Sequence, residues 1–245
     1  IIMKILIASP VKQTEEIFDL FFRSLQRLTI PKGVEVDKVF YFHNSPELVE
    51  YCKRNKHDSY YVLNNDVKYT IDNTTHIWKS ENINAVIYMK NELIKLAQKG
   101  YDYIFFVDSD LILEKDTLER LLEANKDIIS QTFWTKWTPE AIPLPNSWDY
   151  DSYNFEEYSK YLGNGIIKVG MTGACTLIKT DVFKEKNIDF SPINNLRICG
   201  EDRTFCIRTA VYGYELFTDL RKPAFHIYRP NQIDEAKEFF NKTNN

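Results

Sequence analysis

Two aspartates separated by one residue follow a short apolar run and offer a candidate cation site. The run spans 103–107, and Asp108-Ser109-Asp110 comes directly after it. Hard cations such as Mg²⁺ and Mn²⁺ prefer oxygen ligands, and a nucleotide diphosphate can complete their coordination. Aspartates are also common in turns and at helix starts. The apolar strand in front of the pair favours a ligand site, because ligands of open α/β sheets bind beyond the carboxyl ends of the strands.

The elements that must hold these aspartates alternate between strand-like and helical patterns. Strands are expected at 4–8, 36–42, 60–63, 103–107 and 128–133. Helices are expected after Thr14, around 48–52, over 83–98 and after Asp116. This alternation is typical of βαβ units and predicts an α/β fold with a mixed, mainly parallel central sheet flanked by helices. We expect the first strand to break into a loop at Ser9-Pro10.

The second half of the chain is less regular. From 134 to about 165 it is rich in Trp, Tyr and Pro and has little periodicity. Long loops of this kind are often functional, so substrate specificity is expected there. Trp134 and Trp137 could stack on sugar or acceptor groups or cover the edge of the core. The other expected elements are a strand at 175–179, a helix over about 202–212, and strands near 215–218 and 224–227.

Composition excludes several classes of protein. The chain has 245 residues, 44% of them hydrophobic, which is enough for one substantial core. Its formal charge is -4 and its Lys and Arg residues are dispersed, so no footprint for nucleic acid is expected. No apolar stretch has the length of a membrane span or the form of a signal peptide. The four cysteines lack a CxxC pair, which favours reduced thiols. We expect a cytoplasmic protein, and peripheral attachment to the inner face of a membrane stays open.

Four pieces of sequence, in this order, resemble the GT-A glycosyltransferases, especially family 2-like nucleotide-sugar transferases. They are Ala8-Ser9-Pro10-Val11, Met89-Lys90-Asn91-Glu92, Asp108-Ser109-Asp110 and Gly200-Glu201-Asp202. The resemblance runs from Ile5 to about Arg229 and implies a single Rossmann-like GT-A domain over 1–245. Its halves would be a nucleotide-binding part at about 3–133 and an acceptor-binding and catalytic part at about 134–230, with 231–245 as a C-terminal tail.

The resemblance implies a metal-bound donor, with a UDP-sugar as the first choice. Asp110 would ligate Mn²⁺ or Mg²⁺, which stabilises the departing nucleotide diphosphate as a Lewis acid. Asp108 would contact the ribose or donor sugar and share in the metal site. His226 resembles the extra histidine that many GT-A enzymes add to this site, and a neutral imidazole is a competent ligand for Mn²⁺. An ordinary hydrogen-bonded histidine at a strand end is the alternative.

The other residues that the resemblance assigns to the donor come from several segments. Ser9, Pro10 and Asn44 would line the base and ribose pocket, although the family often has an acidic residue where this chain has Asn44. Lys90 and Arg229 would approach the phosphates. Gly173 lies in a small-residue segment that would allow the backbone to approach the donor sugar. The further donor contacts implied by the matching motifs are Val11, Asn91 and Ser109.

The acidic pair Glu201-Asp202 is the expected source of a catalytic base. Inverting transfer needs a carboxylate that removes the proton of the acceptor hydroxyl as its oxygen attacks the anomeric carbon. The resemblance assigns this role to Asp202, and Glu201 would orient the acceptor. Acidic residues also favour the first turn of a helix for electrostatic reasons alone.

Three other functions use part of the same pattern. A haloacid-dehalogenase-like phosphatase also has Asp-x-Asp after a strand, but normally after the first strand of its domain. A sugar-nucleotide pyrophosphorylase would be expected to open with a Gly-rich phosphate loop, and the segment after the first strand has no glycine. A GT-A-like module that binds a sugar nucleotide without turnover is the non-enzymatic alternative. The presence of metal-type carboxylates and a candidate base favours the transferase.

Overall fold

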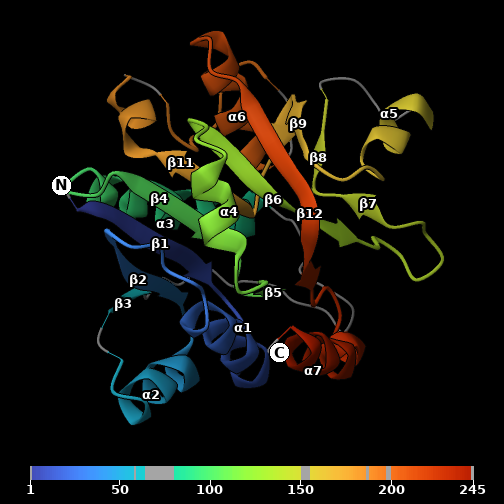
Figure 1. Cartoon of the computed structure of the whole chain (residues 1–245). Helices are drawn as coiled ribbons and strands as arrows, with labels where there is room; N and C mark the ends of the chain where they lie inside the picture. Colours follow the sequence, from blue (N-terminus) through green and yellow to red (C-terminus); the bar gives the residue numbers. More distant parts are fainter. Residues whose placement is uncertain are drawn as a thin grey trace.

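The structure, a computed structural model, describes residues 2–57, 59–63, 80–149, 155–185, 188–196 and 200–243. Over these residues the chain builds one ten-stranded sheet with helices on both faces (Figure 1). The strands are β1 (Met3–Val11), β2 (Val34–His43), β3 (Tyr60–Leu63), β4 (Tyr103–Val107), β5 (Leu111–Ile112), β6 (Ile128–Thr135), β7 (Leu144–Pro145), β8 (Ser147–Trp148), β9 (Ile166–Val169), β10 (Met171–Thr172), β11 (Cys175–Lys179) and β12 (Leu216–His226). Strands β8 and β10 form a separate small sheet.

The helices are α1 (Glu15–Gln26), α2 (Pro46–Arg54), α3 (Ser80–Ala97), α4 (Thr117–Glu123), α5 (Phe155–Lys160), α6 (Glu201–Val211) and α7 (Ile233–Lys242), with short 3₁₀ turns at Thr180–Lys184 and Pro230–Gln232. The main sheet has the order β3-β2-β1-β4-β11-β6-β12-β5. Four of the seven pairings along this path are parallel, and the pairings of β11 with both its neighbours are antiparallel. The predicted mixed, mainly parallel α/β sheet is confirmed.

Two hydrophobic cores arise because alternate residues of a strand face opposite sides of the sheet. Ile5 and Ile7 of β1 pack into one core with the buried faces of α1, α2, α4 and α7. Leu6 and Ala8 pack into the other core with α3 and α6. The central strand β4 is buried at every residue, as the apolar run predicts. Both cores therefore hold β4 firmly, and the residues that follow it begin from a fixed point.

The expected break of the first strand at Ser9-Pro10 is wrong. β1 continues to Val11, and Pro10 is in register with Tyr41 of β2. Beyond Ala8 only β2 pairs with β1, because the pairing with β4 ends there. A strand with one open side tolerates a residue that has no N–H group, so proline does not end it.

The C-terminal region is more ordered than the pattern indicates. The two strands expected near 215–218 and 224–227 are one strand, β12, with an irregularity between Asp219 and Ala224. The predicted tail contains helix α7, which packs beside α1 (Figure 1). The Arg27 guanidinium lies 4.0 Å from the centre of the Phe240 ring and donates to the Phe240 carbonyl at 2.7 Å.

Cysteine chemistry matches the expectation for the part of the chain that can be described. Cys52, Cys175 and Cys206 are buried free thiols. Cys199 lies outside the described residues. Among the described helices, none is both long and apolar enough to cross a membrane.

Candidate functional site

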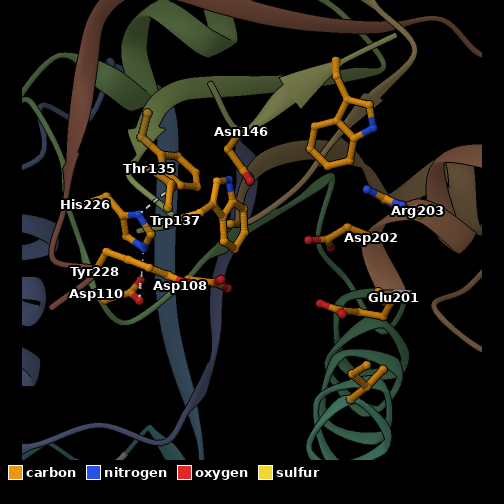
Figure 2. A pocket seen from close by; sticks show the side chains of 15 residues that line it. Asp108, Asp110, Thr135, Trp137, Asn146, Glu201, Asp202, Arg203, His226 and Tyr228 are labelled. Carbon is orange, nitrogen blue, oxygen red and sulfur yellow. Dashed lines mark hydrogen bonds and ion pairs between the residues drawn. The ribbon is translucent and has the colours of Figure 1, made fainter. Parts of the chain in front are cut away.

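A cavity of about 290 Å³ lies beyond the carboxyl end of β4 (Figure 2). Five of the predicted site residues line it, although they come from three separate segments of the chain: Asp108, Asp110, Glu201, Asp202 and His226. Figure 2 shows the metal-type residues on one side and the acidic pair of α6 on the other. The cavity therefore has two chemically distinct walls.

The first wall depends on the two-residue strand β5, which begins directly after Asp110. β5 pairs antiparallel with the end of β12, so that His226 is opposite Leu111. The Ile227 N–H also donates to the Asp110 carbonyl at 2.9 Å. This pairing brings together two residues that are 116 positions apart. His226 Nε2 lies 3.3 Å from Asp110 Oδ2.

The imidazole of His226 is fixed from several directions. Its Nδ1 lies 2.9 Å from the Thr135 hydroxyl oxygen. The rings of Phe133 and Tyr228 pack against it, with centroids at 4.9 and 5.3 Å. When Nδ1 carries the proton and donates it to Thr135, Nε2 directs its lone pair towards Asp110. This is the tautomer that a metal ligand requires.

The donor set of Asp110 and His226 fits a divalent cation of the Mn²⁺ type. One carboxylate oxygen and one neutral imidazole nitrogen are suitable ligands, and their separation lets one ion contact both. Within the described ranges, no group of three or more His, Cys, Asp or Glu side chains converges to hold a metal. The protein therefore offers two ligands from this pair, and cations of this type commonly take further ligands from substrate phosphates and water.

Asp108 lines the same cavity but is held by different contacts. Its N–H donates to the Ala174 carbonyl at 2.8 Å, which links the end of β4 to the segment before β11. Burial raises the pKa of the Asp108 carboxyl well above its ordinary value; Lys90 opposes this shift, and Asp110 adds to it by repulsion. A nearby cation or hydrogen-bond donor would stabilise the ionised form of this carboxyl.

The opposite wall is the first turn of α6. Gly200 precedes the helix with φ 97°, a conformation that favours glycine, and Glu201 and Asp202 follow. The Asp202 side chain is 26% exposed, towards the cavity, whereas that of Glu201 is 9% exposed. Burial raises the pKa of Asp202 to about 6, although the Lys90 ammonium acts to lower it. A carboxylate with this pKa is a stronger base than an ordinary aspartate.

Gly173 is required by the space that Asp202 occupies. A Cβ atom on Gly173 would lie 2.1 Å from Asp202 Oδ2 and 2.4 Å from its Cγ. The next residue, Ala174, has φ 61°, and its N–H donates to the Asp202 carboxylate. A strained residue beside a catalytic group often marks a functional site. Gly173 does not line the cavity, so its predicted approach to a donor sugar stays a prediction. What the structure shows is a different reason for a glycine here, which is close packing against the candidate base.

We expect Gly173→Ala to displace Asp202 and to lower both stability and activity. Overpacking of this kind typically costs about 1–3 kcal/mol, which in a chain of this size lowers Tm by several degrees, roughly 2–4 °C per kcal/mol. Thermal unfolding and donor turnover measure the two effects. Gly163→Ala is the comparison variant, because a Cβ there would lie 3.2 Å from the Lys160 carbonyl oxygen, a tight contact but much less severe than the overlap at Gly173, so its effect should be smaller. Equal, small effects at both glycines would contradict this account of Gly173.

Two cationic residues predicted to approach phosphates are engaged elsewhere. Lys90 is 1% exposed, and its ammonium contacts Glu201 and Asp202 from outside the cavity. The Arg229 guanidinium donates to the Trp137 carbonyl at 2.9 Å and does not line the cavity. In this structure, Lys90 therefore acts on the acidic wall, and Arg229 supports the loop that carries Trp137.

The other predicted donor contacts do not line this cavity: Ser9, Pro10, Val11, Asn44, Asn91 and Ser109. Ser9 and Val11 are buried in β1. Asn44 is exposed with φ 41°, and its carbonyl accepts from Lys12 at 2.5 Å. The Asn91 side chain bonds Ser191 and the backbone of Phe190. Their roles in binding a nucleotide stay predictions.

Several cavity residues carry no recognisable motif: Thr135, Asn146, Trp148, Arg203 and Tyr228. The Asn146 amide donates to the Gly173 carbonyl at 3.0 Å. The Arg203 guanidinium lies 5.3 Å from the centre of the Trp148 ring. The unusual aromatic content of 134–165 is the sequence signal for this region. Trp137 lines the cavity, whereas Trp134 does not and packs against Tyr158 instead, and stacking of either on a substrate stays a prediction. Arg203 was identifiable only by its place next to Asp202.

A comparison with known families identifies the family of this chain. A sequence profile of the family described as "Glycosyltransferase family 25, N-terminal domain" matches residues 3–194. The chain belongs to this glycosyltransferase family. The matched range of the glycosyltransferase includes Asp108 and Asp110, whereas the acidic pair of α6 and His226 lie beyond it. A haloacid-dehalogenase-like phosphatase and a pyrophosphorylase are no longer needed to explain the sequence.

Solved structures show the fold of this glycosyltransferase. S. aureus TarS 1–349 in complex with UDP-GlcNAc matches with a TM-score of 0.53 and 15% identity, over 98% of this chain and 66% of that chain. A mannosyltransferase, PcManGT from Pyrobaculum calidifontis in complex with GDP-Man and Mn²⁺, matches with a TM-score of 0.55 and 10% identity, over 91% and 56%. The predicted GT-A glycosyltransferase fold is confirmed.

The glycosyltransferase is shorter than these solved chains. In a further match to S. aureus TarS 1–349, with a TM-score of 0.55 and 15% identity, 98% of this chain is covered, but only 65% of the TarS chain. No curated protein matches the chain significantly.

Proposed function

We propose that the chain transfers a sugar from a nucleotide diphosphate sugar to a hydroxyl acceptor, with a divalent metal and with inversion at the anomeric carbon. A UDP-sugar is the first choice of donor. The observation that carries the proposal is that a cation-type pair, Asp110 and His226, faces the acidic pair of α6 across one cavity. The sugar nucleotides bound by TarS and PcManGT support the donor class.

Asp110 and His226 would hold the metal ion in this proposal. When bound, such an ion supplies Lewis-acid stabilisation of the negative charge on the departing nucleotide diphosphate. Asp108, beside the pair in the cavity, is placed to accept hydrogen bonds from hydroxyls of the donor. We also propose that 3–133 binds the nucleotide and that 134–230 binds the acceptor and carries the catalytic base. Asp108 and Asp110 come from the first part, whereas His226 and the acidic pair of α6 come from the second.

Asp202 would remove the proton from the acceptor hydroxyl. Its carboxylate faces the cavity, while contacts with Lys90 and the Ala174 N–H hold it from behind. The acceptor would then lie between Asp202 and the donor. Trp148, Asn146 and Arg203 line the cavity on this side, and Arg203 is the only Lys or Arg among the described residues that line it. These residues would orient the acceptor.

A calorimetric screen tests the donor half of the proposal. UDP-glucose, UDP-galactose, UDP-GlcNAc and GDP-mannose would be titrated with and without Mn²⁺, followed by an assay for release of nucleoside diphosphate. We expect one donor to bind in a Mn²⁺-dependent manner and to be hydrolysed slowly without an acceptor. Binding without any release would favour the non-catalytic module, and no binding by any donor would contradict the proposal.

We expect turnover to fall as the pH drops below about 6. The raised pKa of Asp202 means that its proton-accepting form predominates only above this value. The profile of kcat/KM should therefore rise through pH 6 and level off towards neutrality. Release of nucleoside diphosphate between pH 4.5 and 8 measures it, with thermal unfolding at each pH to exclude loss of fold. A flat profile between pH 5 and 7 would remove Asp202 from the role of base.

A further inference from the structure

Lys90 is a buried cation that the proposed reaction does not use directly. It projects from α3, and its side chain is 1% exposed. Its Nζ lies 2.7 Å from Glu201 Oε1 and 2.7 Å from Asp202 Oδ1. A buried ammonium is costly unless it is paired and hydrogen-bonded, so these two contacts are the reason that a lysine can occupy this place.

The surroundings of Lys90 strengthen this link. Its Nζ lies 4.8 Å from the centre of the Phe190 ring and 6.0 Å from that of Phe106. Aromatic faces attract a cation, and they also keep water away from it, which makes its interaction with carboxylates stronger than at the surface. Although burial acts to lower it, the nearby Asp202 and Glu201 carboxylates raise the pKa of Lys90 above its ordinary value. Lys90 is therefore a permanent charge.

The contact with Lys90 offsets the electrostatic repulsion between the two carboxylates of the acidic wall. Glu201 and Asp202 are consecutive residues, and two ionised carboxylates beside each other repel. One ammonium contacts both, and it connects α3 to the first turn of α6. The Ala174 N–H holds the Asp202 carboxylate from a second direction. The Asp202 side chain is thereby left with one open direction, which is the cavity.

We propose that Lys90 is a positioning residue of the transfer reaction, which holds the Asp202 carboxylate towards the acceptor and keeps it ionised. This inference rests on the proposed role of Asp202 as the base. It does not require Lys90 to touch the substrate, and Lys90 does not line the cavity.

The charges around Asp202 give the proposal a directional test. Burial raises the pKa of Asp202, Lys90 lowers it, and Glu201 raises it. Removing Lys90 should therefore raise the pKa further, whereas neutralising Glu201 should lower it. Among the described residues, the charged or titratable side chains around Asp202 are Lys90 from α3, Glu201, Arg203 and Cys206 from α6, and Asp108 after β4.

The experiment compares Lys90→Met, Lys90→Arg and Glu201→Gln in the full chain. We expect Lys90→Met to lose about 100-fold or more in kcat at pH 7, the lower range for loss of a positioned base, with donor affinity changed less than threefold. The acidic limb of its pH profile, which is the fall in activity at low pH, should shift to higher pH by at least about one unit. Lys90→Arg should recover part of the activity, because it keeps the charge. Glu201→Gln should move the limb in the opposite direction.

Lys95→Met is the matched control. Lys95 lies on the same helix, is 67% exposed and pairs with Glu92 at 2.6 Å, away from the acidic wall. Its removal should leave kcat and the pH profile unchanged. If Lys90→Met does not fold, Glu201→Gln provides the test. An acidic limb of the pH profile that does not move in Glu201→Gln would contradict the electrostatic effect of neighbouring charges on Asp202. Activity of Lys90→Met within threefold of wild type, with an unmoved limb, overturns the proposal.

A second readout separates this inference from the proposed function. ¹³C NMR of carboxyl-labelled aspartate, with Asp202→Asn for assignment, follows Asp202 in the protein without donor or metal. The Asp202 signal should titrate at higher pH in Lys90→Met than in wild type. If the Asp202 titration shifts but the wild type transfers no sugar, the proposed transferase function is refuted, while the effect of Lys90 on Asp202 stands. An unshifted titration would refute the link.

Discussion

Asp202→Asn is expected to lose about 1,000-fold in turnover while it binds the donor as tightly as the wild type. The amide has nearly the shape of the carboxylate and can still accept from Lys90, which lies 2.7 Å from Oδ1. It cannot accept a proton from an acceptor hydroxyl, and general-base contributions are typically about 10²–10⁴-fold. Donor binding should persist because the metal-type residues lie on the other wall. Calorimetry with Mn²⁺ and a transfer assay measure the two properties.

Asp127→Asn is a suitable control for this substitution. Asp127 is 50% exposed and pairs with Lys179 away from the cavity, so the same chemical change there should alter neither property. Near-normal transfer by Asp202→Asn would show that the proton is taken by another group, for which Glu201 is the nearest candidate.

Asp110→Ala is expected to abolish the dependence of donor binding on Mn²⁺. Asp110 and His226 are the two proposed ligands on this wall, and in the described part of the chain no third His, Cys, Asp or Glu joins them. Loss of one leaves a single protein ligand. Even partners outside the ligand shell change metal affinity by roughly 10–100-fold, so we expect donor affinity in Mn²⁺ to fall by at least about 100-fold.

Titration of the donor in Mn²⁺ and in a chelator measures this loss. His226→Ala should weaken the Mn²⁺ dependence in the same direction. Asp181→Asn serves as control, because Asp181 is 77% exposed and pairs with Lys184. If Asp110→Ala bound the donor normally in Mn²⁺, the cation would have to be held elsewhere, and the assignment of this wall would be wrong.

Local patterns in the sequence predict the parts of this fold that depend on neighbouring residues. The apolar run before Asp108 identifies a central strand, and the alternation of strands and helices identifies the α/β class. The end of β1 was misjudged because a proline is compatible with a strand that has one unpaired side. Helix α7 does have a local signal, because Ile233, Ala236 and Phe240 recur at helical spacing, and only its packing beside α1 could not be predicted from the sequence.

The candidate site shows the same limit. Asp108-Ser109-Asp110 and Glu201-Asp202 are recognisable as motifs, so their residues could be selected from the sequence. The contact between Lys90 and Asp202 could not be predicted from the sequence, because the two residues are 112 positions apart. No local pattern distinguishes a lysine that contacts phosphate from one that contacts a carboxylate. Arg203 and Asn146 also became visible only when the fold placed them at the cavity.

The pairing of β5 with the end of β12 has a consequence for the protein while it is being made. Asp110 emerges from the ribosome first, and the strand that carries His226 follows more than a hundred residues later. A chain halted at residue 194, where the family profile ends, lacks α6 and β12 altogether. Such a truncated chain would carry Asp108 and Asp110 but neither the acidic pair of α6 nor His226, so the cavity would lack part of both walls.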